Sequence, residues 1–356
     1  MINLIPGPVS VPAPVLEVMG LDYGSGDLDE NFLELYNLTE KNLQKILGTN
    51  EQVIIQTGEG MWGLWGALKS SLNHGDKVVS LCTGVFGYGI ADMAESLGAN
   101  VARVCFEYDQ TMNDSEKLLE TVKLHNPVLV TAVHCETPSG TINPLPLMAR
   151  VKKEFPNVVI CVDTVASAGG MPVDADKNGV DITLNGSQKA ISAPPSMSFV
   201  SISKLAWERI EKVGYSGYDA FLPFKNAQKD FFFPNTPYWH GVAALNKAAE
   251  LLLEEGLNNV FARHRECADF CREKISKMGL QLFPDASAQL ADTVTAVKLP
   301  EKYDWIKFNR ACREKGLAIA GSYGKLAGKV FRIGHMGNQA RHGLLKSGLE
   351  IIESII

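Results

Sequence analysis

Apolar runs alternate with amphipathic stretches between residues 50 and 203. The apolar runs have the length of strands and lie at 52–56, 77–81, 100–106, 127–133, 157–162, 181–185 and 197–203. Most of them are separated by helical patterns such as residues 62–72 and 86–98. Near-continuous apolar strands separated by helices are typical of a mostly parallel sheet that helices cover on both faces. The pattern therefore predicts an α/β fold.

The rest of the chain has a different pattern. Residues 213–237 are rich in Gly, Tyr, Phe and Pro, which indicates a functional or interface loop. Residues 238–278 have the pattern of two long helices broken near Gly256. They are followed by strand-like segments (281–283, 293–299, 330–334) and helical ones (303–315, 338–355). We expect a large domain over residues 1–250, with an N-terminal segment 1–15, and a small α+β domain over residues 251–356.

Composition narrows the class of protein. The chain has 356 residues, of which 46% are hydrophobic and 21% charged, so global disorder is excluded and about two domains are expected. No apolar run approaches the roughly 20 residues of a membrane helix, and the start of the chain lacks the basic region of a signal peptide. The net charge of −6 disfavours nucleic acid and anionic membranes as partners.

Seven cysteines are spread along the chain, mostly in apolar runs. An odd number in such positions indicates buried free thiols in a reducing compartment, so we expect a cytoplasmic protein. His264, Cys267 and Cys271 share one face of a predicted helix. Two Cys and one His on a single helix rarely complete a tetrahedral zinc shell, so we favour a packed helix face and predict no metal site.

The string G-x-G-x-x-G occurs once, at residues 58–63 (GEGMWG), between a predicted strand and a predicted helix. This is the context of a dinucleotide site, and an NAD-linked dehydrogenase is one possible function. Such a site requires an acidic residue at the end of the next strand, which here reads Ser-Leu-Cys-Thr at 80–83. We therefore disfavour the dehydrogenase and retain only a helix start suited to a phosphate.

Two residues with chemical potential end successive strands. Asp163 follows the apolar run 157–162, and Lys189 follows the run 181–185 within an uncharged stretch. A lysine in such surroundings is a candidate for a lowered pKa and Schiff-base chemistry. Taken singly, Asp163 is equally a turn cap and Lys189 a surface lysine. Together with the upstream phosphate-binding helix start, they form the set of parts that carbonyl chemistry with pyridoxal phosphate requires.

Five motifs extend this argument over nearly the whole chain. They are Pro-Gly-Pro at 6–8, HCETPSG at 134–140, VDTVAS at 162–167, GSQKA at 186–190 and RIGHMG at 332–337. With these motifs the sequence resembles the class V aminotransferases of fold type I, in the alanine–glyoxylate and serine–pyruvate branch. The resemblance implies a mostly parallel seven-stranded sheet, a small C-terminal domain and bound pyridoxal 5′-phosphate.

The resemblance also implies roles for residues around the cofactor ring. Lys189 resembles the lysine that bonds to the cofactor and moves the proton during transfer. Asp163 resembles the partner of the pyridine nitrogen. Phe86 matches the aromatic residue stacked on the ring, Val165 the residue on the opposite face, and Thr137 the hydroxyl at the 3′-oxygen.

Further positions match the phosphate end of the cofactor. Gly60, Met61 and Gln188 correspond to the phosphate loop. Thr236 resembles a phosphate contact that the second subunit of a homodimer supplies. The resemblance therefore implies a homodimer with shared active sites.

The substrate would be a small amino acid, such as alanine or serine, and a small 2-oxo acid, such as glyoxylate or pyruvate. Arg332 resembles the arginine that binds the substrate carboxylate, and Gly7 also matches a substrate-site position. Glu59 departs from the usual pattern, because a carboxylate beside a phosphate loop is unfavourable unless a cation faces it.

A pyridoxamine–pyruvate transaminase of the same branch carries a glutamate at the position of Glu59, and Arg341 is then a candidate for a second carboxylate contact, or equally an exposed residue near the start of a helix. Transfer from pyridoxamine to pyruvate is therefore the second candidate function. A lyase or a cofactor-free protein of the same fold would be a more distant possibility, and the intact Lys189 and Asp163 disfavour the cofactor-free protein.

Overall fold

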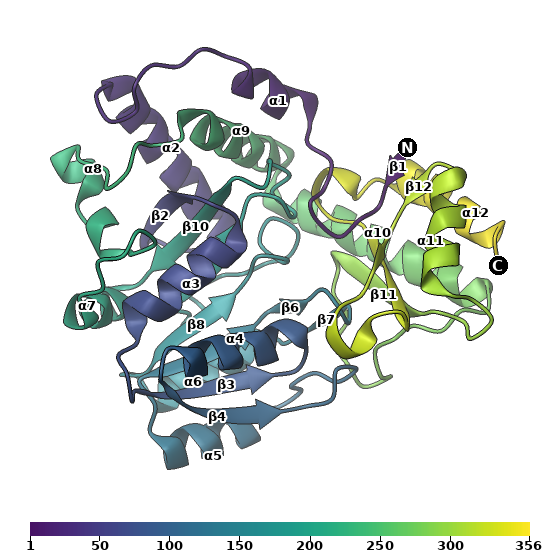
Figure 1. Ribbon diagram of the computed structural model, residues 1–356, viewed down its shortest axis with the longest axis horizontal. Coiled ribbons are helices and arrows are strands. Elements are labelled where there is room, and N and C mark those ends of the chain that lie inside the picture. The colour runs from purple at the N-terminus through teal and green to yellow at the C-terminus, as the bar shows by residue number, and fades with distance from the viewer.

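The computed structural model describes residues 1–356 and contains one large sheet of seven strands (Figure 1). The strand order is β2-β10-β9-β8-β5-β3-β4, and only β10 runs antiparallel to its neighbours. The seven strands are β2 (Gln52–Thr57), β3 (Lys77–Cys82), β4 (Asn100–Cys105), β5 (Leu129–Val133), β8 (Val159–Asp163), β9 (Ile182–Gly186) and β10 (Met197–Ile202). Each of them coincides with one of the predicted apolar runs, so the predicted α/β fold is confirmed.

Both faces of this sheet are buried, and successive residues of a strand point to opposite layers. Val53 and Ile55 of β2 belong to one apolar core, whereas Ile54 belongs to the other. The first core is closed by α1 (Ala13–Met19), α2 (Glu30–Leu47), α5 (Glu116–His125), α6 (Pro146–Glu154) and α9 (Trp239–Glu255). The second is closed by α3 (Gly60–Ser71), α4 (Val85–Ser96) and α7 (Lys204–Val213). Strands covered on both faces account for the near-continuous apolar runs.

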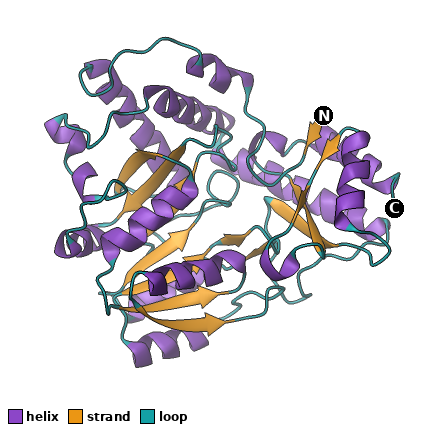
Figure 2. Ribbon diagram, viewed as in Figure 1, coloured by secondary structure: helices purple, strands orange, loops and turns teal.

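The C-terminal part lies to one side of the large sheet (Figure 2) and has its own smaller core. A three-stranded antiparallel sheet of order β11-β14-β13 packs with three helices. These elements are β11 (Val294–Lys298), β13 (Ala320–Gly321), β14 (Val330–Gly334), α10 (Leu257–Lys277), α11 (Trp305–Glu314) and α12 (His342–Glu353). The predicted break between two long helices falls at Gly256, where φ is +84°. The predicted strand at 281–283 is only a single bridge, Leu282 to Val297.

The start of the chain lies beside this C-terminal part (Figure 1). Strand β1 (Ile2–Asn3) pairs in parallel with β12 (Leu317–Ala318). The division at residue 250 stays a prediction, but this pairing places the first residues on the C-terminal elements. The remaining short elements are β6 (Cys135–Glu136), β7 (Thr141–Ile142), α8 (Ala227–Asp230), η1 (Leu222–Phe224), η2 (Gly324–Leu326) and η3 (Gly337–Gln339). No helix is both long and apolar enough to cross a membrane.

Candidate active site

The carboxyl ends of the parallel strands meet at one edge of the large sheet, where open α/β sheets bind ligands. A cavity lined by thirteen residues lies there. Nine of its thirteen lining residues are predicted site residues: Glu59, Gly60, Met61, Phe86, Thr137, Asp163, Val165, Gln188 and Lys189. The other four, Leu64, Cys135, Ala166 and Leu184, are not among the predicted site residues, although Cys135 and Ala166 lie within two of the motifs. Segments more than 100 residues apart therefore form one site.

Asp163 and Lys189 are the ionisable pair of this cavity. Asp163 ends β8, and its Oδ1 accepts a hydrogen bond from the Val165 amide at 2.9 Å. Burial raises the pKa of Asp163 to about 6, although the Val165 amide and Lys189 oppose the shift. Burial lowers the pKa of Lys189 to about 8, and the nearby Arg332 adds to this effect. Lys189 Nζ donates a hydrogen bond to the Pro6 carbonyl oxygen at 2.8 Å.

The start of the chain packs directly against the lysine. A Cβ on Gly7 would lie 2.4 Å from Lys189 Cδ and 2.6 Å from its Nζ. Gly7 also has φ of +94°, a conformation that side chains rarely adopt. The start of the chain therefore lies against the lysine at Gly7, which does not itself line the cavity, and its substrate role stays a prediction.

Helix α3 begins at the cavity. A Cβ on Gly60 would lie 2.9 Å from Val165 Cγ2, so the missing side chain lets the helix start approach the cavity wall. Its N-cap residue, Glu59, does not cap the helix with its side chain. Instead, Glu59 Oε2 accepts a hydrogen bond from Gln188 Nε2 at 2.9 Å. The carboxylate thus lies beside the positive end of a helix dipole, where an anion is favoured.

The surroundings of β2 and α3 differ from those of a dinucleotide site. Strand β2 lies at the edge of the sheet, and its single neighbour β10 runs antiparallel. A dinucleotide fingerprint follows the first strand of a parallel βαβ unit. Gly63 instead lets α3 pack closely on β10, because a Cβ there would lie 3.2 Å from Ser198 Cβ of β10. The glycines therefore do not mark a dehydrogenase.

Arg332 is buried, with 2% of its surface exposed. Its Nε donates to the Gly321 carbonyl at 2.7 Å, and its guanidinium carbon lies 4.5 Å from the centre of the Tyr323 ring. Burial lowers its pKa, and the nearby Tyr323 opposes that shift. No carboxylate of the chain is among the groups that perturb it. A buried guanidinium without an acidic partner is suited to bind the carboxylate of a ligand.

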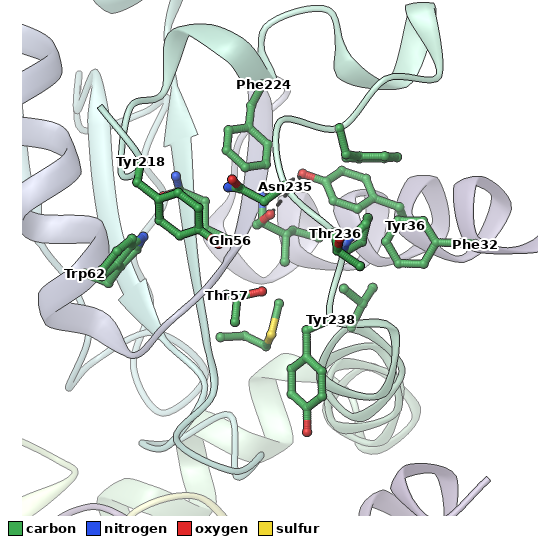
Figure 3. A pocket seen from close by; sticks show the side chains of 15 residues that line it. Phe32, Tyr36, Gln56, Thr57, Trp62, Tyr218, Phe224, Asn235, Thr236 and Tyr238 are labelled. Carbon is green, nitrogen blue, oxygen red and sulfur yellow. Dashed lines mark hydrogen bonds between the residues drawn. The ribbon is translucent and has the colours of Figure 1, made fainter. Parts of the chain in front are cut away.

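Thr236 does not line this cavity. It lines a second, separate cavity among the aromatic residues Phe32, Tyr36 and Tyr238 (Figure 3). Within one copy of the chain Thr236 is therefore separate from Lys189. This is expected if Thr236 contacts the cofactor in the site of a second copy. Its role stays a prediction.

Arg341 lies in a third hollow beside Glu255 and Arg263. Its Nη2 donates to Asn338 Oδ1, and it does not line the cavity of Lys189. The structure thus does not bring Arg341 together with the other predicted site residues, and its role as a carboxylate contact stays a prediction.

His264 lies on the face of α10 that also carries Cys267 and Cys271. Both of its ring nitrogens are engaged: Nδ1 bonds with the Val260 carbonyl at 2.7 Å, and Nε2 accepts from the Gly337 amide at 2.8 Å. Burial lowers the pKa of this histidine to about 4. The ring is therefore part of the packing of this face.

The cavity residues fit pyridoxal phosphate. Asp163 Oδ2 has no hydrogen bond within the chain, and the buried Gln188 Oε1 also has no partner. The cavity supplies an acid, a lysine, an aromatic wall at Phe86 and an aliphatic wall at Val165. These groups suit a flat, protonated heteroaromatic aldehyde. The phosphate end is less usual, because Glu59 lies at the helix start.

Comparison with known proteins identifies the family of the chain. The family model of the class V aminotransferases matches residues 18–341, and the chain belongs to that family of pyridoxal-phosphate enzymes. An uncharacterised aminotransferase of Methanocaldococcus jannaschii is 35% identical, over 94% of this chain and 87% of that protein. Pyridoxamine–pyruvate transaminase of Mesorhizobium japonicum is 30% identical, over 96% and 88%. The crystal structure of alanine–glyoxylate aminotransferase from Nostoc sp. superimposes with a TM-score of 0.93, at 27% identity over 99% and 94%.

Proposed function

We propose that the protein transfers an amino group from a small amino acid, such as alanine or serine, to a small 2-oxo acid, such as glyoxylate or pyruvate. The observation that carries the proposal is the shared cavity of Lys189 and Asp163, with the unpaired Arg332 close enough to shift the pKa of Lys189. The similarity to alanine–glyoxylate aminotransferase supports the substrate class.

Pyridoxal phosphate, when bound, supplies an aldehyde for the amino group and a ring that accepts electrons. The chain supplies the rest of the chemistry. Lys189, with a pKa of about 8, is partly neutral near neutral pH, so its Nζ can accept and return a proton. Asp163 is ionised above a pH of about 6 and would hold a proton at the ring nitrogen. Arg332 would orient the carboxylate that both substrates carry.

Substitution of Lys189 is the direct test. Lys189→Ala should abolish transamination between alanine and glyoxylate, and borohydride should no longer fix the cofactor to the protein. The matched control is Lys177→Ala, which removes an exposed lysine and should leave both readouts unchanged. Full activity in Lys189→Ala would contradict the proposal.

A second candidate is amino transfer from pyridoxamine to pyruvate. The observation in its favour is Glu59, whose carboxylate lies at the start of α3 on Gln188. An unphosphorylated vitamer places no second anion there, so Glu59 would not repel it. The similarity to pyridoxamine–pyruvate transaminase supports this candidate. Phe86, Thr137 and Gln188 match the phosphate-cofactor members, so we favour the first candidate.

Mass spectrometry of the cofactor released from fresh protein distinguishes the two candidates. The first predicts stoichiometric pyridoxal phosphate and no turnover of pyridoxamine with pyruvate. The second predicts colourless protein that makes pyridoxal and alanine without added pyridoxal phosphate. A matrix of amino donors against pyruvate, glyoxylate and 2-oxoglutarate then identifies the substrate pair.

The proposal includes a cytoplasmic homodimer. Seven free cysteines, six of them buried, suit a reducing compartment. Thr236 in a separate cavity suits a site shared between subunits. The large domain would span residues 1–250 and the small domain residues 251–356.

A further inference from the structure

Glu136 is a fully buried carboxylate next to the site. Its Oε2 accepts a hydrogen bond from the Phe86 amide at 3.1 Å, and its Oε1 accepts one from the Gly87 amide at 2.6 Å. Both amides belong to the first turn of α4, whose N-cap residue, Gly84, has no side chain to cap the helix. A strand distant in sequence therefore supplies the cap of this helix.

Two glycines make room for this carboxylate. A Cβ on Gly84 would lie 2.6 Å from Glu136 Cδ, and a Cβ on Gly87 would lie 3.2 Å from its Oε1. The first turn of α4 is thus shaped around the glutamate on both sides of Phe86. Thr137 follows Glu136 directly and, like Phe86, lines the cavity.

A carboxylate at this position is costly. Burial raises the pKa of Glu136 to about 7, the Gly87 and Phe86 amides oppose the shift, and Asp163 adds to it. No cation is among the groups that perturb it. A polar side chain buried at this cost, with both oxygens engaged by the backbone of one turn, fixes that turn more rigidly than an apolar contact would.

We propose that Glu136 is a positioning residue that fixes the Phe86 ring against the pyridine ring of the cofactor. The inference rests on the proposed function, in which this cavity holds pyridoxal phosphate. Glu136 itself does not line the cavity, so it acts through Phe86 and touches no reacting atom.

The test is Glu136→Gln, which keeps the size of the side chain but places an N–H₂ group opposite one backbone amide. We expect about ten-fold weaker binding of pyridoxal phosphate to the apoprotein, in line with the loss of a charged hydrogen bond. We also expect a weaker circular dichroism band of the bound cofactor and faster amide exchange over residues 84–90.

The matched control is Asp181→Asn, because Asp181 is another buried carboxylate and accepts from the Ile160 amide at 2.8 Å. Asp181 precedes β9, at the opposite edge of the sheet, so this variant should lose stability but keep cofactor affinity and dichroism.

A double-mutant cycle with Phe86→Leu tests whether Glu136 acts through Phe86. If Glu136 acts through Phe86, Glu136→Gln should weaken binding less than two-fold in the Phe86→Leu background. An equal ten-fold loss in both backgrounds would overturn the inference, as would Glu136→Gln protein that is less stable but unchanged in affinity and dichroism. If Glu136→Gln does not fold, the same measurements are made on Glu136→Asp. This variant keeps the carboxylate but shortens the side chain by one methylene. Wild-type protein that does not bind pyridoxal phosphate at Lys189 would instead refute the proposed function.

Discussion

Burial acts on the two central ionisable residues in opposite directions. It raises the pKa of Asp163 to about 6 and lowers that of Lys189 to about 8. Both shifts disfavour the charged form, as desolvation requires. In the free protein the two residues are therefore both charged mainly between those two values, and the chemistry that each would perform is available near neutral pH.

The pKa of Asp163 leads to a prediction about cofactor binding. As the pH falls through about 6, Asp163 takes up a proton and loses the charge that would hold the ring nitrogen. The affinity of the apoprotein for pyridoxal phosphate should fall over this range. Asp163→Asn should lower kcat by orders of magnitude and should lack the part of the pH dependence that belongs to Asp163. Asp163→Glu should retain more activity.

Titration of binding by fluorescence between pH 5 and pH 8 checks this prediction. The cofactor's own titration affects both proteins equally, so it cancels when the affinity of Asp163→Asn is subtracted from that of wild type at each pH. Parallel curves for the two proteins would reduce Asp163 to the cap of the Val165 turn.

Arg332 leads to a second prediction. Arg332→Lys keeps the charge but loses the planar fork that binds a carboxylate through two nitrogens. Because the amino acid and the oxo acid carry the same carboxylate, KM should rise for both by about ten-fold or more, the equivalent of ~1.4 kcal/mol or more. Steady-state kinetics with each substrate varied in turn measures this effect. A rise for one substrate alone would mean that the carboxylate binds elsewhere.

Among the elements, helix α3 has a start that depends on glycine. Gly60→Ala would place a methyl group 2.9 Å from Val165 Cγ2. The stiff valine would have to move into the cavity, at a cost of about 1–3 kcal/mol. We expect cofactor affinity to fall about ten-fold, measured by equilibrium binding.

Gly89→Ala is the matched control, because a Cβ there would meet no atom within 4 Å. Gly89 lies inside α4, where alanine should stabilise the helix by about 0.5–1 kcal/mol. Its melting temperature should rise and its cofactor affinity should stay unchanged. Equal affinity in the two variants would show that the approach of α3 to Val165 does not shape the site.

The strands and the residues at their ends could be predicted from sequence, and the physical reason is burial. A strand covered on both faces is apolar throughout, so a polar residue such as Asp163 marks its end, and the carboxyl ends of parallel strands meet at one edge. Residues whose effect depends on tertiary contact could not be predicted in this way. Glu136 stands out in the sequence only as part of a motif, because its contact with Phe86 joins positions 50 residues apart. Tyr323, which stacks on Arg332, lies in a stretch without any pattern.

At the scale of the whole molecule, three exposed apolar side chains lie on the segment 213–237 and just before α2, and the segment packs on that helix. Phe232 and Tyr218 of the segment 213–237 are 74% and 71% exposed, and Leu28, just before α2, is 80% exposed. The segment packs on α2, since the ring centres of Phe233 and Phe32 lie 5.2 Å apart. Large apolar residues exposed on packed elements are candidates for a protein interface. The same segment carries Thr236, the predicted contact to a second subunit.

This arrangement predicts that Phe232→Glu separates the subunits. In the proposed homodimer Phe232 would be buried, and a carboxylate there would lose its hydration without gaining a partner. Wild-type protein should sediment at about twice the chain mass of 38.8 kDa, and Phe232→Glu should shift toward the monomer as the protein is diluted. Cofactor affinity should fall with it, because Thr236 would no longer reach the other site. The matched control is Leu124→Glu on α5, which changes a side chain that is 86% exposed and should leave mass and affinity unchanged. A wild-type protein that sediments as a monomer and binds pyridoxal phosphate fully would show that each chain completes its own site and that Thr236 has no part in it.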